Sequence, residues 1–316
     1  MPDAIVTQGL TKEYAGNILA VDHLSFTVRQ GEIFGFLGLN GAGKTTTIKM
    51  LSTLISPTSG SAEILGFDVT KEGLRVREKL AVVQQQESYD RNLTVEASLR
   101  LYASLWSVPK AESVVRIESL LKEFDLEELK KRKIRWLSFG QRRRLQVARE
   151  FLHDSSILIL DEPTVGMDVL ARHAFLDFCK KISSSGRTIF YTTHIISEAE
   201  YLCDRVALIH KGKIAALDSP KELKKRYGDV KSVLVSIRNP SEIQRLSKLF
   251  DELKIERQEV TKDSTELRLV SSDPFKLASE VSRLLEQSGF GQESISIVEP
   301  SLEDVMVRLV RSEEPS

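Results

Sequence analysis

The stretch that decides the fold is "GLNGAGKTTT", Gly38–Thr47. An apolar run, "EIFGFL", stands before it, and the helix-compatible "IKML" follows. In such a loop, glycines let successive backbone N–H groups point at phosphate oxygens, and the following helix adds its positive dipole end. The stretch therefore predicts a strand, a phosphate-binding loop and a helix. It fits the pattern G-x-x-x-x-G-K-[ST], whose fixed positions here are Gly38, Gly43, Lys44 and Thr45.

Three residues of this stretch are assigned to parts of a nucleotide. We expect Lys44 to reach the β- and γ-phosphates and Thr45 to supply a hydroxyl to Mg²⁺. Thr46, one residue further into the helix, is placed to touch the α-phosphate. A chance glycine turn would need neither the strand before it nor the helix after it, so nucleotide binding is the better interpretation.

The second motif is "ILILDEP", 157–163. An apolar strand brings Asp161 to its C-terminal end, the edge at which α/β sheets bind ligands. Asp161 suits coordination of Mg²⁺, directly or through water, and Glu162 is placed to orient or deprotonate an attacking water. Acidic pairs at strand ends are common, but together with the glycine loop this pair predicts phosphoryl transfer.

Two further segments have both a functional and a plain structural interpretation. His194 ends the apolar run "RTIFYTTH", where a neutral imidazole could reach the γ-phosphate or the water, although a lone histidine is more often structural. In "WLSFGQRRRLQVAREFL" a loop becomes a helix, and its hydroxyl, N–H groups and dipole could meet a phosphate. The residues in question there are Ser138, Gly140 and Gln141. The structural alternative is a capped surface helix whose arginines, 142–144, face water.

Bulk composition limits the class of protein. The 316 residues carry 45 basic and 45 acidic side chains, so the formal net charge is zero and no basic footprint argues for nucleic acid or an anionic membrane surface. Cys179 and Cys203 make neither a disulfide framework nor a metal cluster. We found no signal peptide and no apolar run long enough to span a membrane. The sequence favours a soluble, cytoplasmic protein that reaches the membrane through a partner.

The order of apolar runs predicts two domains. Near-continuous apolar strands between helical segments indicate a parallel α/β domain over 1–228, with a helical subdomain inserted at about 93–150. We expect the boundary near Gly228, which follows the short helical stretch "SPKELKKRY". Residues 229–316 alternate strand and helix patterns in the order βαββαβ plus a final helix, which is the ferredoxin-like pattern. This second domain holds no recognisable site.

The combined motifs resemble those of the ATP-binding-cassette (ABC) ATPases. Gly38 to Thr45 resembles their Walker A motif, "ILILDEP" their Walker B motif with a catalytic glutamate, "LSFGQRRRL" their signature and "TTH" their switch histidine. The resemblance runs from Ile5 to about Gly228 with the motifs in order. "EPSLEDV" near the end is similar to the C-terminal extension of drug- and sodium-export-type, daunorubicin-resistance-like ATPase subunits.

The resemblance implies roles for individual residues. Glu162 would be the catalytic base, with Lys44, His194 and Gln85 as its catalytic partners, and Thr45, Gln85 and Asp161 would surround Mg²⁺. "VVQQQESYDRNLT" resembles the Q-loop, where Gln84, Gln85 and Gln86 compete and the offset to "NLT" favours Gln85. The ATP-binding set implied by the family is Tyr14 on adenine, Val21 near the ribose, Asn40, Gly41, Ala42, Gly43, Lys44, Thr45, Thr46, Ser138, Gly140, Gln141 and Asp168 of the D-loop "VGMD".

The family also implies partners. Ser138, Gly140 and Gln141 would act on ATP bound to a second copy, so that a head-to-tail homodimer encloses two ATPs. A separate transmembrane permease would dock near 85–106, and the subunit would power an exporter. Phe139 departs from the family, because the commonest signature has glycine there, and a bulky residue could weaken binding in trans. The alternative is a soluble ABC ATPase of DNA repair, translation or chromosome maintenance, but this chain lacks a second cassette and a long heptad run.

Overall fold

The computed structural model describes residues 2–85, 89–153, 155–227, 232–237, 239–250, 253, 255, 257–260, 266–271, 273–290 and 293–312. The chain forms two compact units, Met1–Pro220 and Lys221–Ser316. The boundary expected near Gly228 lies outside the described residues, and the two units divide slightly earlier, at the start of helix α8 (Pro220–Tyr227).

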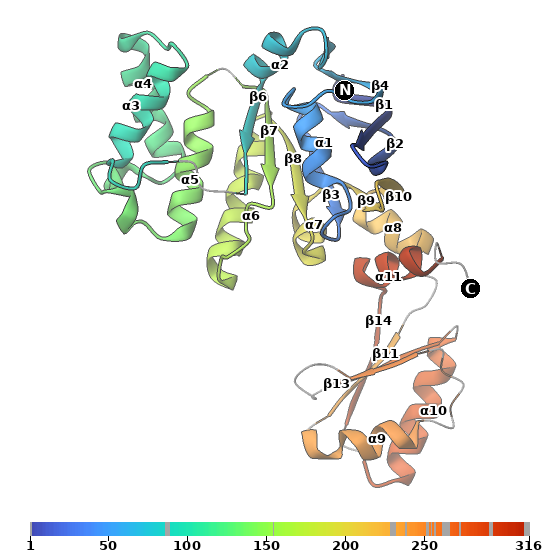
Figure 1. Ribbon diagram of the computed structural model, residues 1–316. Coiled ribbons are helices and arrows are strands. Elements are labelled where there is room, and N and C mark those ends of the chain that lie inside the picture. The colour runs from blue at the N-terminus through green and yellow to red at the C-terminus, as the bar shows by residue number, and fades with distance from the viewer. Residues whose placement is uncertain are drawn as a thin grey trace. The chain divides into compact units, whose positions relative to one another are not determined.

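A mainly parallel sheet holds the phosphate-binding loop of the first unit (Figure 1). Its strands run parallel apart from the β9–β10 hairpin, which turns at Lys211-Gly212. The loop follows β3 and leads into α1 (Lys44–Leu51), so the predicted strand, loop and helix are present. Among the described residues the strand order is β10 (Lys213–Asp218), β9 (Arg205–His210), β3 (Ile33–Gly38), β8 (Thr188–Thr193), β7 (Ile157–Asp161) and β6 (Leu80–Val83).

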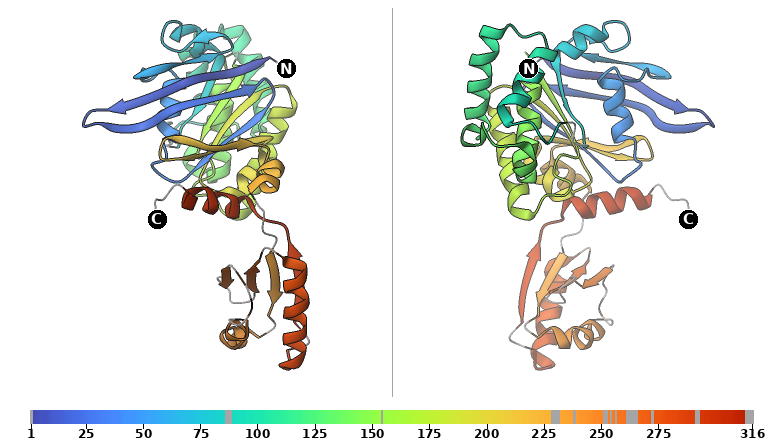
Figure 2. Two further views of the ribbon diagram at one scale, coloured as in Figure 1. Left: turned by 90° about the vertical axis from the view of Figure 1, so that its right-hand side faces the viewer. Right: turned by 60° about the vertical axis from the view of Figure 1, so that its left-hand side comes forward.

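A second, antiparallel sheet in this unit has no counterpart in the sequence analysis. Its strands β1 (Asp3–Tyr14) and β2 (Ile18–Arg29) pair antiparallel and form the long blue ribbon in Figure 2. Phe26 from this sheet stacks on Phe34 of β3, with ring centroids 5.5 Å apart, and the two sheets share one hydrophobic core. Its order, in the described part of the chain, is β2 (Ile18–Arg29), β1 (Asp3–Tyr14), β4 (Ser59–Ile64) and β5 (Phe67–Asp68).

Helices gather beyond the β6 edge of the parallel sheet (Figure 1). They are α3 (Val95–Leu105), α4 (Lys110–Glu123) and α5 (Phe139–Glu150), and they lie between β6 and β7 in the chain. The helical pattern of "LEELKKRK" is realised only as a 3₁₀ turn, Glu127–Leu129, because this stretch has few apolar side chains to bury. The remaining helices in the described part of this unit are α2 (Gly73–Lys79), α6 (Val169–Ser184) and α7 (Ile196–Leu202), with a second 3₁₀ turn at Ile134–Trp136.

The second unit is an antiparallel sheet with two helices packed on one face. Core residues of the sheet, Val233, Val235, Leu267 and Leu269, contact apolar residues of α9 (Ile243–Leu249) and α10 (Pro274–Gln287). Residues 261–265 lie outside the described part of the chain, and Glu242 stands at the N-cap position of α9. Its described strands pair in the order β12 (Arg257–Val260), β13 (Glu266–Val270), β11 (Ser232–Ser236) and β14 (Ser294–Val298), and α11 (Leu302–Ser312) is the last described helix.

Candidate functional site

The phosphate-binding loop has a backbone shape that requires glycine. Gly41 and Gly43 have φ values of 81° and 102°, in the left-handed region that L side chains rarely adopt. A Cβ at Gly43 would lie 2.5 Å from the carbonyl oxygen of Ala20, so any side chain there would force the backbone apart. No described side chain caps the first turn of α1. The loop and the helix start therefore present backbone N–H groups that can bind an anion.

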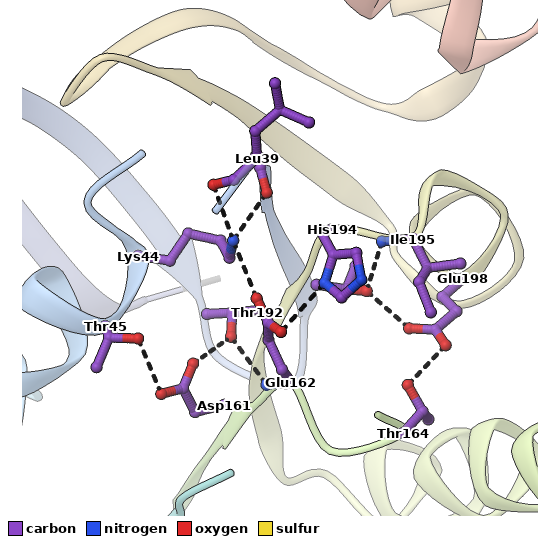
Figure 3. A network of polar contacts seen from close by, with 12 residues as sticks. Leu39, Lys44, Thr45, Asp161, Glu162, Thr164, Thr192, His194, Ile195 and Glu198 are labelled. Carbon is purple, nitrogen blue, oxygen red and sulfur yellow. Dashed lines mark hydrogen bonds and ion pairs between the residues drawn. The ribbon is translucent and has the colours of Figure 1, made fainter. Parts of the chain in front are cut away.

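Lys44 is held beside the loop by three contacts (Figure 3). Its Nζ donates hydrogen bonds to the carbonyl oxygens of Gly38, at 2.8 Å, and Leu39, at 3.2 Å. The same atom lies 3.0 Å from Oε1 of Glu162. Only 5% of the lysine is exposed, so this cation and the carboxylate interact with little screening by water. The arrangement places one positive charge between the loop and the candidate base.

Thr45 and Asp161 come together at the base of the site. The hydroxyl of Thr45 donates to Oδ2 of Asp161 at 3.2 Å, and Thr192 donates to Oδ1 at 2.8 Å. In the described residues no cluster of three His, Cys, Asp or Glu could hold a metal ion alone. Two oxygen donors next to a phosphate-binding loop nevertheless fit Mg²⁺, which takes one or two protein oxygens together with phosphate oxygens and water.

Glu162 has a strained backbone that two hydrogen bonds stabilise. Its φ of 46° is unusual for a non-glycine residue and carries a cost of about 1–3 kcal/mol. The N–H of Glu162 donates to both the carbonyl oxygen and the hydroxyl of Thr192, each at 3.1 Å. Its Oε2 lies 3.1 Å from Nδ1 of His194 (Figure 3). The carboxylate of Glu162 thus contacts both Lys44 and His194.

Glu198 is a buried carboxylate that the sequence analysis missed. It accepts hydrogen bonds from Thr164 at 2.6 Å, Tyr191 at 2.9 Å and Thr193 at 2.8 Å, and Arg172 Nε lies 3.4 Å away. Thr164 follows the Walker B glutamate by two residues, and Thr193 precedes His194. Glu198 thus joins the segment after Glu162 to the strand that carries His194. No local pattern in the sequence marks it.

A cavity of about 400 Å³ is lined by all four predicted catalytic residues, Lys44, Gln85, Glu162 and His194. Gln85 lines it, whereas Gln84 lines a different hollow and Gln86 lies outside the described residues. Asp161 does not line this cavity itself but accepts a hydrogen bond from Thr45, which does. The lining residues are Ala20, Asn40, Gly41, Gly43, Lys44, Thr45, Thr46, Gln85, Glu162, Val165 and His194.

The rest of the predicted ATP-binding set does not line this cavity. Ala42 is buried within the loop and Val21 is buried beside it, whereas Tyr14 ends β1 with 39% of its surface exposed. Asp168 caps α6, where its side chain accepts from the N–H of Ala171 at 2.9 Å. The signature residues Ser138, Gly140 and Gln141 stand at the start of α5, also away from the cavity lining.

The signature segment forms a complete capping box. Ser138 Oγ accepts from the N–H of Gln141 at 3.3 Å, and Gln141 Oε1 accepts from the N–H of Ser138 at 3.0 Å. The ring of Phe139 lies along Gly166 of its own chain, where a Cβ would be 3.7 Å from the ring. The guanidinium groups of Arg142 and Arg143 lie 5.5 and 5.6 Å from the ring centroid. Phe139 therefore packs against its own D-loop and arginines.

Arg143 overturns the structural alternative of three water-facing arginines. It is 1% exposed, whereas Arg142 and Arg144 are only partly buried. The difference arises because the side chain of Arg143 points toward the Q-loop and the segment after Glu162. There its N–H groups donate to the carbonyl oxygens of Gln85 and Pro163. A run of three identical residues gives no sign of which one is buried.

The comparisons with known proteins decide the family. The family model described as "ABC transporter" matches residues 21–165. The chain is 35% identical over 312 residues to the doxorubicin resistance ATP-binding protein DrrA of Mycobacterium tuberculosis, across 97% of this chain and 93% of that protein. The chain belongs to the ATP-binding proteins of ABC transporters.

Other relatives of this ABC ATPase agree. The Nod factor export ATP-binding protein I of Ralstonia nicotianae is 40% identical, over 68% of this chain and 67% of that protein. A solved structure of an ATP-binding subunit of an ABC transporter superposes with a TM-score of 0.62 at 30% identity, covering 71% of this chain and 93% of the other. These relatives are named for export and drug resistance rather than for DNA repair or translation.

Family membership sets the activity of this ABC ATPase. It binds and hydrolyses ATP to power an ABC transporter, and the resemblance identified from the motifs is confirmed. Within the described residues no helix has the length and hydropathy needed to cross a bilayer. Subunits of this kind act with separate transmembrane subunits.

Proposed function

We propose that the chain is the Mg²⁺-dependent ATPase subunit of an exporter and that hydrolysis takes place in the cavity beside the phosphate-binding loop. The observation that carries this proposal is the 3.0 Å contact of Lys44 with Glu162, which puts the phosphate-binding cation and the base in one cavity. Phosphoryl transfer is accelerated mainly by positioning and charge stabilisation, so no covalent nucleophile is needed. Lys44 binds the β- and γ-phosphates, and Thr46 and the loop amides from Asn40 to Gly43 bind the rest of the triphosphate.

Glu162 acts as the general base and His194 stabilises the transition state. A base must lie within hydrogen-bond reach of the water that it deprotonates. Because Lys44 contacts Glu162, a γ-phosphate bound to Lys44, and the water that attacks it, would lie next to Glu162. The 3.1 Å contact between Glu162 and His194 supports this pairing, because the imidazole both orients the carboxylate and borders the same cavity.

Thr45, Asp161 and Gln85 hold the metal ion. The Thr45–Asp161 contact supplies two oxygen atoms at the inner end of the cavity, and Gln85 lines the same cavity from the Q-loop. When bound, Mg²⁺ neutralises the charge that develops between the β- and γ-phosphates. Its removal by a chelator should therefore abolish turnover.

A second copy of the chain completes each site. The signature residues Ser138, Gly140 and Gln141, together with Asp168, contact the ATP of the other copy. Two features support a head-to-tail homodimer. The signature residues lie away from their own cavity, and Val169 and Leu170, directly after Asp168, are 64% and 82% exposed, as expected of apolar side chains that a partner covers. Tyr14 stacks on adenine and Val21 borders the ribose.

A permease helix docks on the side of the Q-loop that faces away from the ATP cavity. An apolar hollow of about 190 Å³ lies there and includes Gln84, Trp106 and Leu54, of which Leu54 is 58% exposed. Leu74, which is 73% exposed, borders a neighbouring hollow that shares Trp106. The position agrees with docking near 85–106 and would place the ATPase on the cytoplasmic face of the membrane.

The second unit, proposed as a domain over 229–316, has a ferredoxin-like fold. Its strand order β12-β13-β11-β14, all antiparallel, is the order expected for βαββαβ connections. The helices α3 to α5 form the helical subdomain of the ATPase domain, 1–228. We assign the second unit to regulation or to stabilisation of the dimer. Removal of residues 229–316 tests this role, because unchanged ATP-driven dimerisation would contradict it.

Co-expression tests the transport function. The chain should co-purify with the membrane protein encoded beside its gene, and ATP hydrolysis should rise in their complex. The exposed-leucine variant Leu54→Glu should weaken the association, whereas Leu170→Glu, on the proposed dimer surface, should leave it intact. Failure to associate with any neighbouring membrane protein would contradict the exporter assignment.

A further inference from the structure

Arg143 forms a buried bridge between three segments of the ATPase. It lies on α5, five residues after the signature serine, and is 1% exposed. Its Nη1 donates to the carbonyl oxygen of Gln84 at 2.7 Å and its Nη2 to that of Gln85 at 2.7 Å. Its Nε donates to the carbonyl oxygen of Pro163 at 2.9 Å. Nη1 also donates to Oε1 of Gln146, on the next turn of α5, at 2.8 Å.

The acceptors of Arg143 flank two groups that face the cavity. The carbonyl oxygen of Gln85 accepts a hydrogen bond from Arg143, and Gln85 also lines the ATP cavity. Pro163 directly follows Glu162, whose backbone is already strained at φ 46°. A shift of either carbonyl group would move a catalytic side chain relative to the phosphates. Misplacement of such groups by about 1 Å can slow catalysis by about 100-fold.

The fork shape of the guanidinium group is essential to this bridge. Its planar N–H groups point in fixed directions and can serve carbonyl groups from several segments at once. A lysine keeps the positive charge but has one nitrogen atom, which cannot reach the carbonyl groups of Gln84, Gln85 and Pro163 together. The neighbouring arginine Arg144 has a different role, because it pairs with Asp125 at 3.1 Å near the surface.

We propose that Arg143 is a positioning residue for ATP hydrolysis that fixes the Q-loop backbone against the turn after Glu162 and against the signature helix. The inference rests on the proposed function, because it assigns Arg143 to act through Gln85 and Glu162. Arg143 also links the Q-loop physically to the signature segment. Its side chain binds the Q-loop backbone, and its own helix, α5, begins with the signature residues. A displacement of the Q-loop is thereby transmitted to α5.

The variant Arg143→Lys in the full chain tests this assignment. We expect kcat for ATP to fall by about 10- to 100-fold, while the Kd for ATP stays at the wild-type value because the Walker A contacts are untouched. The matched control Arg144→Lys should keep the wild-type kcat. Thermal unfolding is measured on both variants. A lower Tm of Arg143→Lys with an unchanged kcat per folded molecule would show a purely structural role and overturn the proposal.

A double-mutant cycle with Gln85→Ala separates action through the Q-loop from an independent effect. If Arg143 works by placing Gln85, the double variant should be no slower than the slower single variant. Losses of kcat that multiply would overturn the assignment of Arg143 to the positioning of Gln85. The proposed function has its own check, because Glu162→Gln must abolish hydrolysis. If Glu162→Gln keeps the wild-type rate, both the function and this inference fail, whereas a wild-type rate for Arg143→Lys alone refutes only the inference.

Discussion

Lys44 and Glu162 form an ion pair in the proposed ATP site, with Nζ 3.0 Å from Oε1. The lysine is the residue expected to bind the β- and γ-phosphates, and the glutamate is the proposed base. A γ-phosphate therefore competes with Glu162 for the same cation. We infer that ATP binding loosens this pair and leaves the carboxylate available to a water molecule.

The first prediction concerns Lys44→Ala. The Kd for ATP should rise by at least about tenfold, because a charge-assisted contact to phosphate contributes about 1.5–3 kcal/mol. Lys49→Ala is the matched control, since Lys49 is an exposed lysine on the same helix. Titration with a fluorescent ATP analogue measures both. Equal affinities for the two variants would remove Lys44 from the binding site.

The second prediction concerns Thr45→Ala and the metal ion. Loss of the hydroxyl removes one of two protein oxygens near the metal, so a higher Mg²⁺ concentration should be needed for half-maximal ATPase activity. The Kd for ATP measured in the presence of a chelator should not change. A Mg²⁺ requirement equal to that of the wild type would contradict the assignment of Thr45.

The third prediction is a pH dependence of stability that comes from Glu150. Burial raises the pKa of this carboxyl from 4.5 to about 7, although Arg149 and the backbone N–H of Val82 pull it down. The folded state therefore keeps the proton to higher pH than the unfolded state does, and its stability falls as pH rises from about 4.5 through about 7.

The variant Glu150→Gln should remove this loss. Its Tm should exceed that of the wild type at pH 8, and the difference should shrink toward pH 5. Glu118→Gln, at a carboxylate that is 62% exposed, is the control and should show a much smaller pH-dependent difference. Thermal unfolding across this pH range is the measurement. A constant difference for Glu150→Gln would contradict the prediction.

The fourth prediction tests whether each ATP site uses two copies of the chain. Lys44→Ala damages the Walker A half, and Ser138→Arg blocks the signature half. Each variant alone should have little ATPase activity. In a mixture, the heterodimer contains one site with an intact lysine and an intact serine, so activity should return. A mixture no more active than the sum of its parts would show that one chain completes its own site.

The phosphate-binding loop and the acidic strand end could be predicted because the motif itself determines the geometry. Gly43 has no room for a side chain, and Asp161 must emerge at the end of a buried strand. The antiparallel sheet could not be predicted in the same way. The β1–β2 pairing shifts register between Thr7 and Leu10 and again between Leu10 and Lys12. Such irregularities break the alternation of apolar and polar residues by which strands are identified.

The burial of the charged residues Arg143 and Glu198 could not be predicted from local sequence patterns either. Arg143 differs from Arg142 and Arg144 only in what lies opposite, and the backbone carbonyl groups that accept its N–H groups are 20 to 59 residues away in the chain. Glu198 is stabilised inside the protein by hydroxyl groups up to 34 residues away. Burial of such a group depends on tertiary partners that satisfy it, and these partners are not adjacent in the sequence.

The most direct measurement is the mass and turnover of Glu162→Gln with saturating Mg²⁺ and ATP. Removal of the base should lower the hydrolysis rate by at least about 100-fold while ATP still binds. The ATP-bound form should then accumulate as a dimer of twice 35.6 kDa, and ADP should not produce it. Hydrolysis at the wild-type rate, or a particle that stays at 35.6 kDa with ATP bound, would contradict the account.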